Sequence, residues 1–191
     1  MISLIMIVQN EEAVLSNCLK YAQPHVDRMV LIDGGSTDST VSIAQRYNAE
    51  VYEHLFENHF ANQRNKLLNY AKEGWGLWLD ADEVLCLFPD RLKRLVEYLE
   101  ANGYDSASFN RANLHNDSIE SLDRHTRLFK LGNSPVRWEG KISESLIGLQ
   151  KTYHTDYTIL HAKTWDRQKK QNRFYYKIAP EFYDNKPDGV E

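Results

Sequence analysis

The sequence predicts an α/β fold in which a mixed but mostly parallel sheet is flanked by helices. The first hundred residues alternate strand and helix signals with short connections, a pattern typical of parallel strands joined by right-handed crossovers. After Gly103 the strand signals continue without strong helices between them, which predicts a mixed second half. We therefore expect one domain over residues 1–191, with halves at 1–103 and 104–191.

Strands are predicted wherever short apolar runs occur. Ile2–Val8 is a continuous apolar run of strand length, as expected for a strand that is buried on both faces. Shorter runs predict three more strands in the first half, at residues 29–32, Glu50–Glu53 and 76–79. The second half is expected to contain strands at residues 104–109, 126–130, 136–138 and 157–160.

Helices are predicted between the early strands. Apolar side chains recur near helical spacing in residues 11–21 and 60–71, and Ser36 or Asp38 can cap a helix over the apolar residues 41–47. The most regular helical pattern follows Phe88-Pro89-Asp90, where the proline suits the first turn of a helix. Its apolar residues recur at i, i+3, i+4 and i+7: Leu92, Leu95, Val96 and Leu99. Residues 165–183 predict one or two C-terminal helices.

The overall charge argues against a nucleic-acid-binding protein. The formal net charge is −4, and the chain is 42% hydrophobic and 26% charged, as is ordinary for a globular domain. Basic residues nevertheless gather between positions 163 and 177, where Asp166 is the single acid: Lys163, Arg167, Lys169, Lys170, Arg173 and Lys177. This basic cluster could face a diphosphate or anionic lipid head groups, or it could be a solvated helix face.

The cysteines and the first residues bear on cellular location. Cys18 and Cys86 are too few and too far apart for a disulfide framework or a zinc knuckle, so a reducing compartment, the cytoplasm, is expected. The apolar run at Ile2–Val8 lacks a basic flank and a cleavage site and is too short to span a bilayer. We expect no transmembrane segment, while the basic cluster leaves peripheral membrane contact open.

Three polar clusters follow predicted strands directly. They are Gln9-Asn10-Glu11, Asp33-Gly34-Gly35-Ser36 and Asp80-Ala81-Asp82-Glu83. In an open parallel sheet, ligands bind at the carboxyl ends of the strands near the point where the strand order reverses. Three clusters at such ends therefore predict a ligand site along one edge of the sheet.

The two acidic clusters suggest different chemistry. Asp80 and Asp82 are two residues apart, so one carboxylate can bind Mg²⁺ or Mn²⁺, which often brings a substrate diphosphate, while the other accepts a hydroxyl hydrogen bond. The alternative is a solvated turn that caps the next helix. The Asp33 cluster lacks the G-x-G-x-x-G fingerprint and the Walker lysine. Asp33 is therefore interpreted as an acceptor for a base N–H or a ribose hydroxyl, with the glycines serving the turn.

Together these segments resemble glycosyltransferase family 2, the inverting transferases of the GT-A fold. The matching stretches are Ile7-Val8-Gln9-Asn10-Glu11-Glu12, Asp33-Gly34-Gly35-Ser36-Thr37-Asp38-Ser39-Thr40, Phe60-Ala61-Asn62-Gln63-Arg64-Asn65 and Trp78-Leu79-Asp80-Ala81-Asp82-Glu83. A second set is similar to the subgroup that includes bacterial lipopolysaccharide-core glucosyltransferases: Arg127-Leu128-Phe129, Trp138-Glu139-Gly140 and Ile159-Leu160-His161. The resemblance covers about residues 2–165.

The resemblance implies a role for each matching residue. Asp33 would recognise the nucleobase, and Arg64 would lie against the base or the phosphates. Asp80 would contact the ribose, and Asp82 would hold the metal with His161 as an additional ligand; as a lone histidine, His161 could instead be structural. The remaining residues would line the nucleotide-sugar pocket: Val8, Gln9, Glu11 and Ala81.

Inversion at an anomeric carbon also requires a general base for the acceptor hydroxyl. The subgroup pattern Trp-x-Gly-x-(Val/Ile)-His-Glu corresponds here to Trp138-Glu139-Gly140-Lys141-Ile142-Ser143-Glu144. Glu144 is therefore the candidate base, with a surface acid as the alternative reading. Ser143 replaces the usual histidine, so a role for that histidine does not carry over. Glu83 is the competing carboxylate.

The expected reaction is transfer of a sugar from a nucleoside-diphosphate donor, UDP-linked by expectation, to a carbohydrate or glycoconjugate hydroxyl, with Mn²⁺ or Mg²⁺ as cofactor. Residues 1–103 would bind the donor, and residues 104–191 would form the acceptor side and a C-terminal helix. The alternatives are a non-catalytic sugar-nucleotide or glycan-binding module and a nucleotidyltransferase that makes sugar nucleotides. The chain is short for the family, so it could be the N-terminal part of a longer protein.

Overall fold

The computed structural model of the chain describes residues 1–115, 118–132, 135–162, 164–183 and 185–188. Its helices and strands follow in the order β1 (Ile2–Val8), α1 (Leu15–Ala22), η1 (Gln23–His25), β2 (Arg28–Asp33), α2 (Thr40–Arg46), β3 (Glu50–Glu53), α3 (Phe60–Leu68), β4 (Trp75–Trp78), β5 (Glu83–Cys86), α4 (Arg91–Ala101), β6 (Ser106–His115), β7 (Ser118–Lys130), β8 (Arg137–Glu139), β9 (Ser145–Ile147), β10 (Thr152–Ala162), α5 (Trp165–Ile178) and η2 (Pro180–Phe182). The predicted α/β class is confirmed.

The main sheet is mixed, with the strand order β3-β2-β1-β4-β7-β6-β10-β5. The pairs β3–β2, β2–β1, β1–β4 and β6–β10 are parallel, and the pairs β4–β7, β7–β6 and β10–β5 are antiparallel. Strands β8 and β9 form a separate antiparallel hairpin. The parallel pairs around β1 come from the first half of the chain, as its strand–helix alternation predicts.

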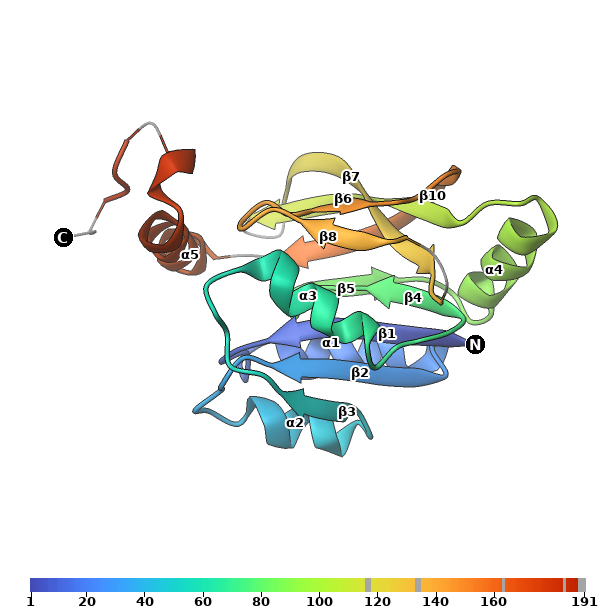
Figure 1. The fold of residues 1–191 in the computed structure, drawn as a ribbon, viewed down its shortest axis with the longest axis horizontal. Helices are drawn as coiled ribbons and strands as arrows, with labels where there is room; N and C mark the ends of the chain where they lie inside the picture. The colour runs from blue at the N-terminus through green and yellow to red at the C-terminus, as the bar shows by residue number, and fades with distance from the viewer. Residues whose placement is uncertain (116–117, 133–134, 163, 184, 189–191) are drawn as a thin grey trace.

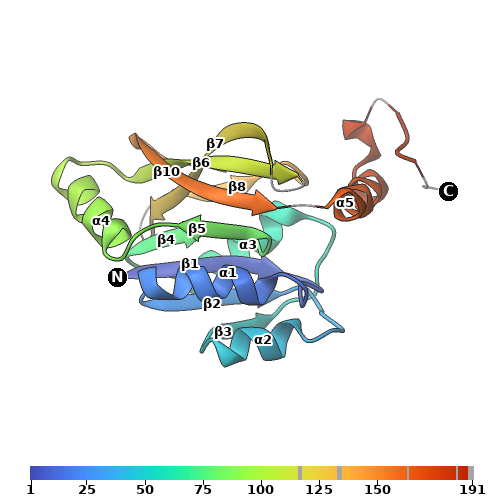
Figure 2. The same ribbon diagram turned by 180° about the vertical axis from the view of Figure 1, so that it is seen from behind.

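Helices cover both faces of the parallel strands (Figures 1 and 2). On one face α1 and α2 pack against Leu4 of β1, and on the other face α3 and the β8–β9 hairpin pack against Ile5. Both side chains are fully buried, and burying a side chain of this size contributes roughly 1.5–3 kcal/mol. The uninterrupted apolar run in β1 therefore reflects a strand that has no exposed face.

The structure differs from the sequence expectation in the second half, where strands β6 and β7 are much longer than predicted. Residues 110–115 and 118–125 add a long hairpin arm to the predicted apolar segments at 104–109 and 126–130. The arm is polar or half-buried and exposes Ile119 and Leu122, so it carries no apolar signal. Strands β5 and β9 were not expected either. They are only four and three residues long, and β5 pairs with the distant β10, whereas β9 pairs with the neighbouring β8.

The first helix begins later than the spacing of its apolar residues suggests. Residues 11–21 were expected to be helical, but α1 begins at Leu15. The backbone N–H of Glu11 donates to Thr40 Oγ1 at 2.7 Å, and that of Glu12 donates to Asp38 Oδ2 at 3.1 Å. These bonds tie the start of the segment to the loop that follows β2, and the first helical hydrogen bond runs from the Leu15 N–H to the Glu11 carbonyl at 3.0 Å.

Helix α5 stands at the end of the sheet toward which the carboxyl ends of β1, β2 and β10 point, whereas α4 lies at the opposite end (Figure 1). Aromatic contacts attach α5 to the start of α3. The ring centroids of Phe60 and Tyr175 are 5.3 Å apart, and those of Phe56 and Phe174 are 6.0 Å apart. None of the helices in the described ranges has both the length and the apolar character that are needed to cross a bilayer.

Candidate active site at the carboxyl ends of the strands

A cavity of about 990 Å³ lies at the carboxyl ends of β1 and β4, with α5 as one of its walls. Nine of the ten predicted site residues line it, all except Asp33: Val8, Gln9, Glu11, Arg64, Asp80, Ala81, Asp82, Glu144 and His161. These residues come from both halves of the chain. The sheet therefore brings together the clusters that the sequence placed at separate strand ends.

The loops after β1 and β2 are joined by hydrogen bonds. The backbone N–H of Asn10 donates to Ser36 Oγ at 2.9 Å, and the N–H of Thr37 donates to Asn10 Oδ1 at 2.8 Å. Asn10 adopts a positive φ of 56°, which asparagine tolerates better than most residues. Gln9 Nε2 donates to the Gly34 carbonyl at 3.1 Å. These contacts fix one rim of the cavity.

Asp33 lies beneath this rim and is only 3% exposed. Its carboxylate accepts hydrogen bonds from the N–H groups of Gly35 and Ser36 at 3.0 and 2.9 Å and from Ser36 Oγ at 2.5 Å. Gly35 has a φ of 99°, a conformation that favours glycine. Both carboxylate oxygens thus stabilise the local turn, and recognition of a nucleobase by Asp33 stays a prediction.

A chain of alternating charges runs from the cavity into the core. Glu144 pairs with Arg64 Nε, and Arg64 Nη2 lies 2.9 Å from Asp80 Oδ1. Asp80 Oδ2 lies 3.8 Å from Arg127 Nη1, and Arg127 Nη2 lies 2.5 Å from Glu83 Oε1. Each of the three acids thereby contacts at least one of two buried arginines that also stack on Trp78, and Asp80 contacts both.

The ring of Trp78 supports both guanidinium groups. Their central carbons lie 4.3 Å (Arg64) and 4.4 Å (Arg127) from its centroid, within the range of a cation–π interaction. In the described part of the chain, Arg64 Nη1 and Arg127 Nη1 and Nε are buried without a hydrogen-bond acceptor. The aromatic face therefore compensates part of the cost of burying these N–H groups.

The acids of the chain have different pKa values. Burial would raise the pKa of Asp80, but the charges of Arg64 and Arg127 outweigh it and hold that pKa well below the ordinary value. For Glu83, burial dominates over the charge of Arg127 and raises the pKa to about 7. At neutral pH Asp80 is ionised, whereas Glu83 is close to its midpoint. The two carboxylates are linked, since Glu83 Oε2 accepts the backbone N–H of Asp80 at 2.9 Å.

A second group of charges surrounds Asp82 where α5 borders the cavity. Asp82 Oδ2 lies 3.5 Å from His161 Nε2 and 3.2 Å from Arg167 Nε. Arg167 comes from α5, and its Nη2 also pairs with Glu11. Burial raises the pKa of Glu11, and Arg167 opposes that shift. Arg167 belongs to the basic cluster of the sequence; Lys163 of that cluster lies outside the described residues.

The part of the cavity around Asp82 contains two candidate ligands for a divalent cation. Within the described ranges, no group of three or more His, Cys, Asp or Glu side chains could hold a metal ion. Asp82 Oδ2 and His161 Nε2 lie 3.5 Å apart. They would be suitable ligands for Mn²⁺ or Mg²⁺, because such ions commonly take their other ligands from substrate phosphates and water. This pair of ligand atoms fits a metal ion that binds together with a diphosphate.

Glu144 lies on the turn between β8 and β9, and two unusual backbone conformations present it to the cavity. Gly140 has a φ of 108° and Ser143 a φ of 51°. A Cβ at position 140 would lie 3.3 Å from the Glu144 Cα, so the turn also requires a small residue there. The tight turn determines where the Glu144 carboxylate meets Arg64.

Several lining residues were not found from the sequence. Arg111 and Asn113 point into the cavity from β6, and Tyr175 lines it from α5. Arg111 and Asn113 are two residues apart, as side chains on one face of a strand must be. That polar alternation was a usable signal, but it lay beyond the predicted end of the strand at residue 109.

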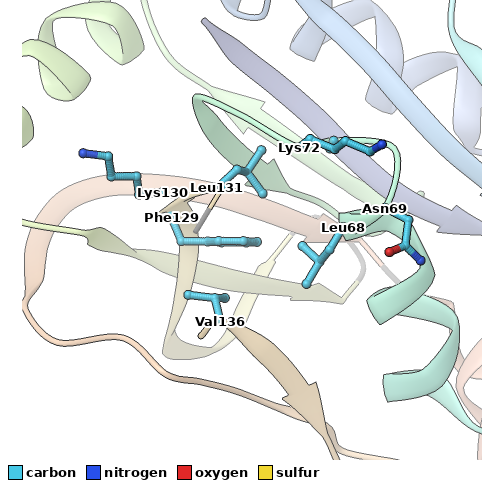
Figure 3. Close-up of a pocket in the computed structure, with 9 residues that line it drawn as sticks. Leu68, Asn69, Lys72, Phe129, Lys130, Leu131 and Val136 are labelled. Atoms are coloured by element: carbon cyan, nitrogen blue, oxygen red, sulfur yellow. The ribbon is translucent and has the colours of Figure 1, made fainter. Parts of the chain in front are cut away.

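A smaller cavity of about 310 Å³ lies elsewhere in the molecule (Figure 3). Phe129, Leu131 and Val136 line it together with Lys72 and Lys130. Lys130 pairs with Trp75 at the amino end of β4, whereas the large cavity lies at the carboxyl end. None of the predicted site residues lines this smaller cavity.

The family model described as "Glycosyl transferase family 2" matches residues 3–174. The chain belongs to glycosyltransferase family 2. This match includes each of the four stretches that carried the resemblance. It ends inside α5, so the helix that contributes Arg167 is part of the matched region.

Solved structures and curated relatives support the family assignment. The fold of S. aureus TarS 1–349, crystallised in complex with UDP-GlcNAc, matches with a TM-score of 0.68 at 14% identity over 93% of this family 2 chain and 64% of that chain. The SPbeta prophage-derived glycosyltransferase SunS of Bacillus subtilis is 27% identical over 141 residues, which is 72% of this chain and 33% of SunS. The expected GT-A fold is confirmed.

A third relative shares a shorter segment. A TPR repeat-containing protein of Synechococcus elongatus is 37% identical over 86 residues, or 45% of this chain and 21% of that protein. The chain thus spans a fifth to a third of the length of these two curated relatives. Membership of the lipopolysaccharide-core subgroup stays a prediction.

Proposed function

We propose that this chain is the catalytic domain of an inverting glycosyltransferase that moves a sugar from a UDP-linked donor to a carbohydrate or glycoconjugate hydroxyl. One observation carries the proposal. A single cavity brings the pair Asp82 and His161 and the ribose candidate Asp80 together with the carboxylate of Glu144. Donor-binding groups and a candidate base therefore share one space.

The donor would lie along the carboxyl ends of β1 and β4. Val8, Gln9 and Ala81 line this part of the cavity, and Asp80 would accept a ribose hydroxyl. TarS has been crystallised with UDP-GlcNAc and with UDP, which favours a uridine nucleotide for a chain of the same fold. Asp33 is proposed to recognise the nucleobase. Both of its carboxylate oxygens accept hydrogen bonds from the rim loop, so contact with a base would require the carboxylate to leave those bonds.

Two residues would hold the divalent cation, Asp82 through Oδ2 and His161 through Nε2. When bound, a Mn²⁺ or Mg²⁺ ion neutralises negative charge that develops on a departing diphosphate. Arg167 and Lys170 line the same end of the cavity from α5. The guanidinium of Arg167 and the ammonium group of Lys170 would bind the diphosphate oxygens, which gives the basic cluster of the sequence a binding role.

Glu144 is the proposed general base. It would take the proton of the acceptor hydroxyl as the acceptor oxygen forms its bond to the anomeric carbon and the bond to the diphosphate breaks. Burial favours Glu144 over Glu83, which is fully buried and does not line the cavity. Arg64 would position the Glu144 carboxylate, because it contacts both Glu144 and Asp80.

The wider assignments are part of the same proposal. We propose one domain with a donor-binding half at residues 1–103, to which His161 and Arg167 add contacts, and an acceptor-side half at residues 104–191. Both cysteines are free in the structure, in keeping with the proposed cytoplasmic location. Peripheral membrane contact would involve the exposed lysines of α5, Lys169 and Lys177.

A two-step measurement separates an enzyme from a binding module. Calorimetry with UDP and Mn²⁺ should show binding, and a panel of nucleotide sugars should then show slow hydrolysis of one donor in the presence of Mn²⁺. Binding without hydrolysis or transfer for any donor and acceptor would favour the non-catalytic alternative. Release of pyrophosphate from UTP and a sugar 1-phosphate would instead reveal the nucleotidyltransferase.

A further inference from the structure

We infer that Asn113 and Asp123 are positioning residues that fix the tautomer of His161, so that its Nε2 lone pair points to the proposed metal site beside Asp82. The inference rests on the metal site of the proposed function for its purpose. Its geometry stands independently. Three neighbouring strands carry the residues: β7 carries Asp123, β6 carries Asn113 and β10 carries His161.

Sheet register aligns these side chains. His161 pairs with Asn113 across β10 and β6, and Asn113 pairs with Ser121 across β6 and β7. Asp123 lies two residues from Ser121, so its side chain projects from the same face of β7. Figure 2 shows β10 beside β6 along most of their length. The contacts described next therefore depend on the sheet and not on flexible loops.

Asp123 sets the direction of the first hydrogen bond. Arg111 donates to it through Nε at 3.0 Å and through Nη2 at 2.8 Å. Burial alone would raise the pKa of Asp123, but the hydrogen bonds from Arg111 and Asn113 outweigh burial and hold that pKa below its ordinary value. An ionised carboxylate can only accept hydrogen bonds.

The carboxylate in turn orients the side-chain amide of Asn113. Only the NH₂ group of that amide can donate, and it lies 3.1 Å from Asp123 Oδ2 and 3.0 Å from Ser121 Oγ. If the amide were reversed, its oxygen would face the carboxylate, and two acceptors would repel each other. The oxygen Oδ1 must therefore point away from Asp123, where it lies 2.7 Å from His161 Nδ1.

The amide oxygen then selects the histidine tautomer. Because Oδ1 can only accept, Nδ1 of a neutral His161 must carry the proton, and Nε2 is left with its lone pair. The Nε2 atom lies 3.5 Å from Asp82 Oδ2. Two acceptors that close to each other are favourable only when a cation or a proton lies between them. The network thus prepares Nε2 as a metal ligand before any metal binds.

Nitrogen NMR of the metal-free full chain tests this directly. In spectra of the neutral ring, the Nδ1 and Nε2 shifts of wild-type His161 should report a proton on Nδ1. A proton on Nε2 would overturn the inference. This measurement does not depend on the proposed reaction, so the inference is tested even if the chain binds no metal.

A pair of variants tests the consequence for metal binding. Asn113→Ala removes the acceptor for Nδ1, and loss of an orienting partner of this kind typically weakens metal affinity about 10- to 100-fold. Ser121→Ala is the matched control, because it removes the other partner of the Asn113 amide and leaves Asp123 in place. Calorimetric titration of Mn²⁺ in the presence of UDP should show the weakening for Asn113→Ala only.

The outcomes are distinguishable. Equal Mn²⁺ affinity in wild type and Asn113→Ala, with both proteins folded, would overturn the positioning role. Absence of Mn²⁺ binding in the wild type would refute the proposed metal site, while the tautomer measurement would still decide the inference. If Asn113→Ala fails to fold, Asp123→Asn offers a second variant, in which the fraction of the Nδ1–H tautomer should fall.

Discussion

Arg64 and Glu144 form an ion pair in which both side chains are nearly excluded from solvent, with 6% and 9% of their surfaces exposed. The residues are 80 positions apart in the chain. Arg64 also contacts Asp80, so one guanidinium links the proposed base to the proposed ribose ligand. The residues proposed for acceptor activation and for ribose binding therefore share a single buried cation.

Removing this cation should destabilise the protein strongly. Arg64→Met leaves the nearly buried carboxylate of Glu144 without its partner and leaves Asp80 with Arg127 alone. Breaking a buried pair in this way costs about 3–5 kcal/mol. Urea denaturation should show the loss. Arg137→Met is the control, because the Arg137–Glu139 pair is about half exposed and pairs of that kind contribute up to about 1 kcal/mol. Similar losses in the two variants would contradict this view of Arg64.

Glu144→Gln should lower turnover and leave donor binding nearly unchanged. Glutamine keeps the size of the side chain but cannot take the acceptor proton, and a general base typically contributes about 10²- to 10⁴-fold to the rate. Steady-state kinetics and UDP calorimetry measure the two effects separately. Glu139→Gln, an exposed acid on the same hairpin, should behave like wild type. A collapse of donor affinity in Glu144→Gln would assign it to binding instead.

Asp82→Asn should abolish metal-dependent transfer while the fold is retained. The amide keeps the shape of the side chain but removes the charge that a divalent cation requires. Activity is expected to fall at least about 100-fold, in line with the loss of a charge-stabilising group. Asp156→Asn, at an exposed position outside the cavity, is the matched control. Full Mn²⁺-dependent activity in Asp82→Asn would remove Asp82 from the metal site.

Arg167→Ala should change metal and nucleotide affinity in opposite directions. Arg167 contacts Glu11 and Asp82, so its removal lowers the positive charge that competes with Mn²⁺. Mn²⁺ alone should then bind more tightly, whereas UDP should bind more weakly because a diphosphate contact is lost. Lys169→Ala, an exposed residue of the same helix that does not line the cavity, should alter neither. Parallel changes in both affinities would argue against this exchange.

The buried Glu83 should make stability depend on pH near neutrality. Its pKa is raised from an ordinary 4.5 to about 7, so between these pH values the folded protein keeps a proton that the unfolded chain has released. Stability from this group is fully present below pH 4.5 and is lost as pH rises toward 7. Glu83→Gln should flatten that part of the profile. Urea denaturation with EDTA at pH 5, 6, 7 and 8 measures it, and parallel profiles would contradict the shift.

Much of the first half could be predicted because its elements signal themselves locally. The apolar run of β1, the proline at the start of α4 and the polar clusters at strand ends each lie within about ten residues. The predicted strands at residues 104–109 and 126–130 were too short for a common reason. Residues 110–115 and 118–125 form strands only because they pair with each other and with β10, and a polar hairpin arm has no apolar periodicity to reveal it.

The candidate site shows the same division. The sequence identified nine of the residues that line the cavity, because strand ends and family motifs are local patterns. It placed Asp33 among the ligand contacts, yet the fold commits both of its carboxylate oxygens to the adjoining turn. It did not identify Asn113, whose contact with His161 spans 48 positions and arises only from strand register.

The sequence by itself determined the family, the α/β class and the residue types that meet at the sheet edge. Only the tertiary structure decided how they are partnered: Arg64 between Glu144 and Asp80, Arg167 across Glu11 and Asp82, and Asn113 against His161. The physical reason is range. Propensity and hydrophobic periodicity act over one turn or one strand, whereas charges pair wherever folding brings them together and excludes water.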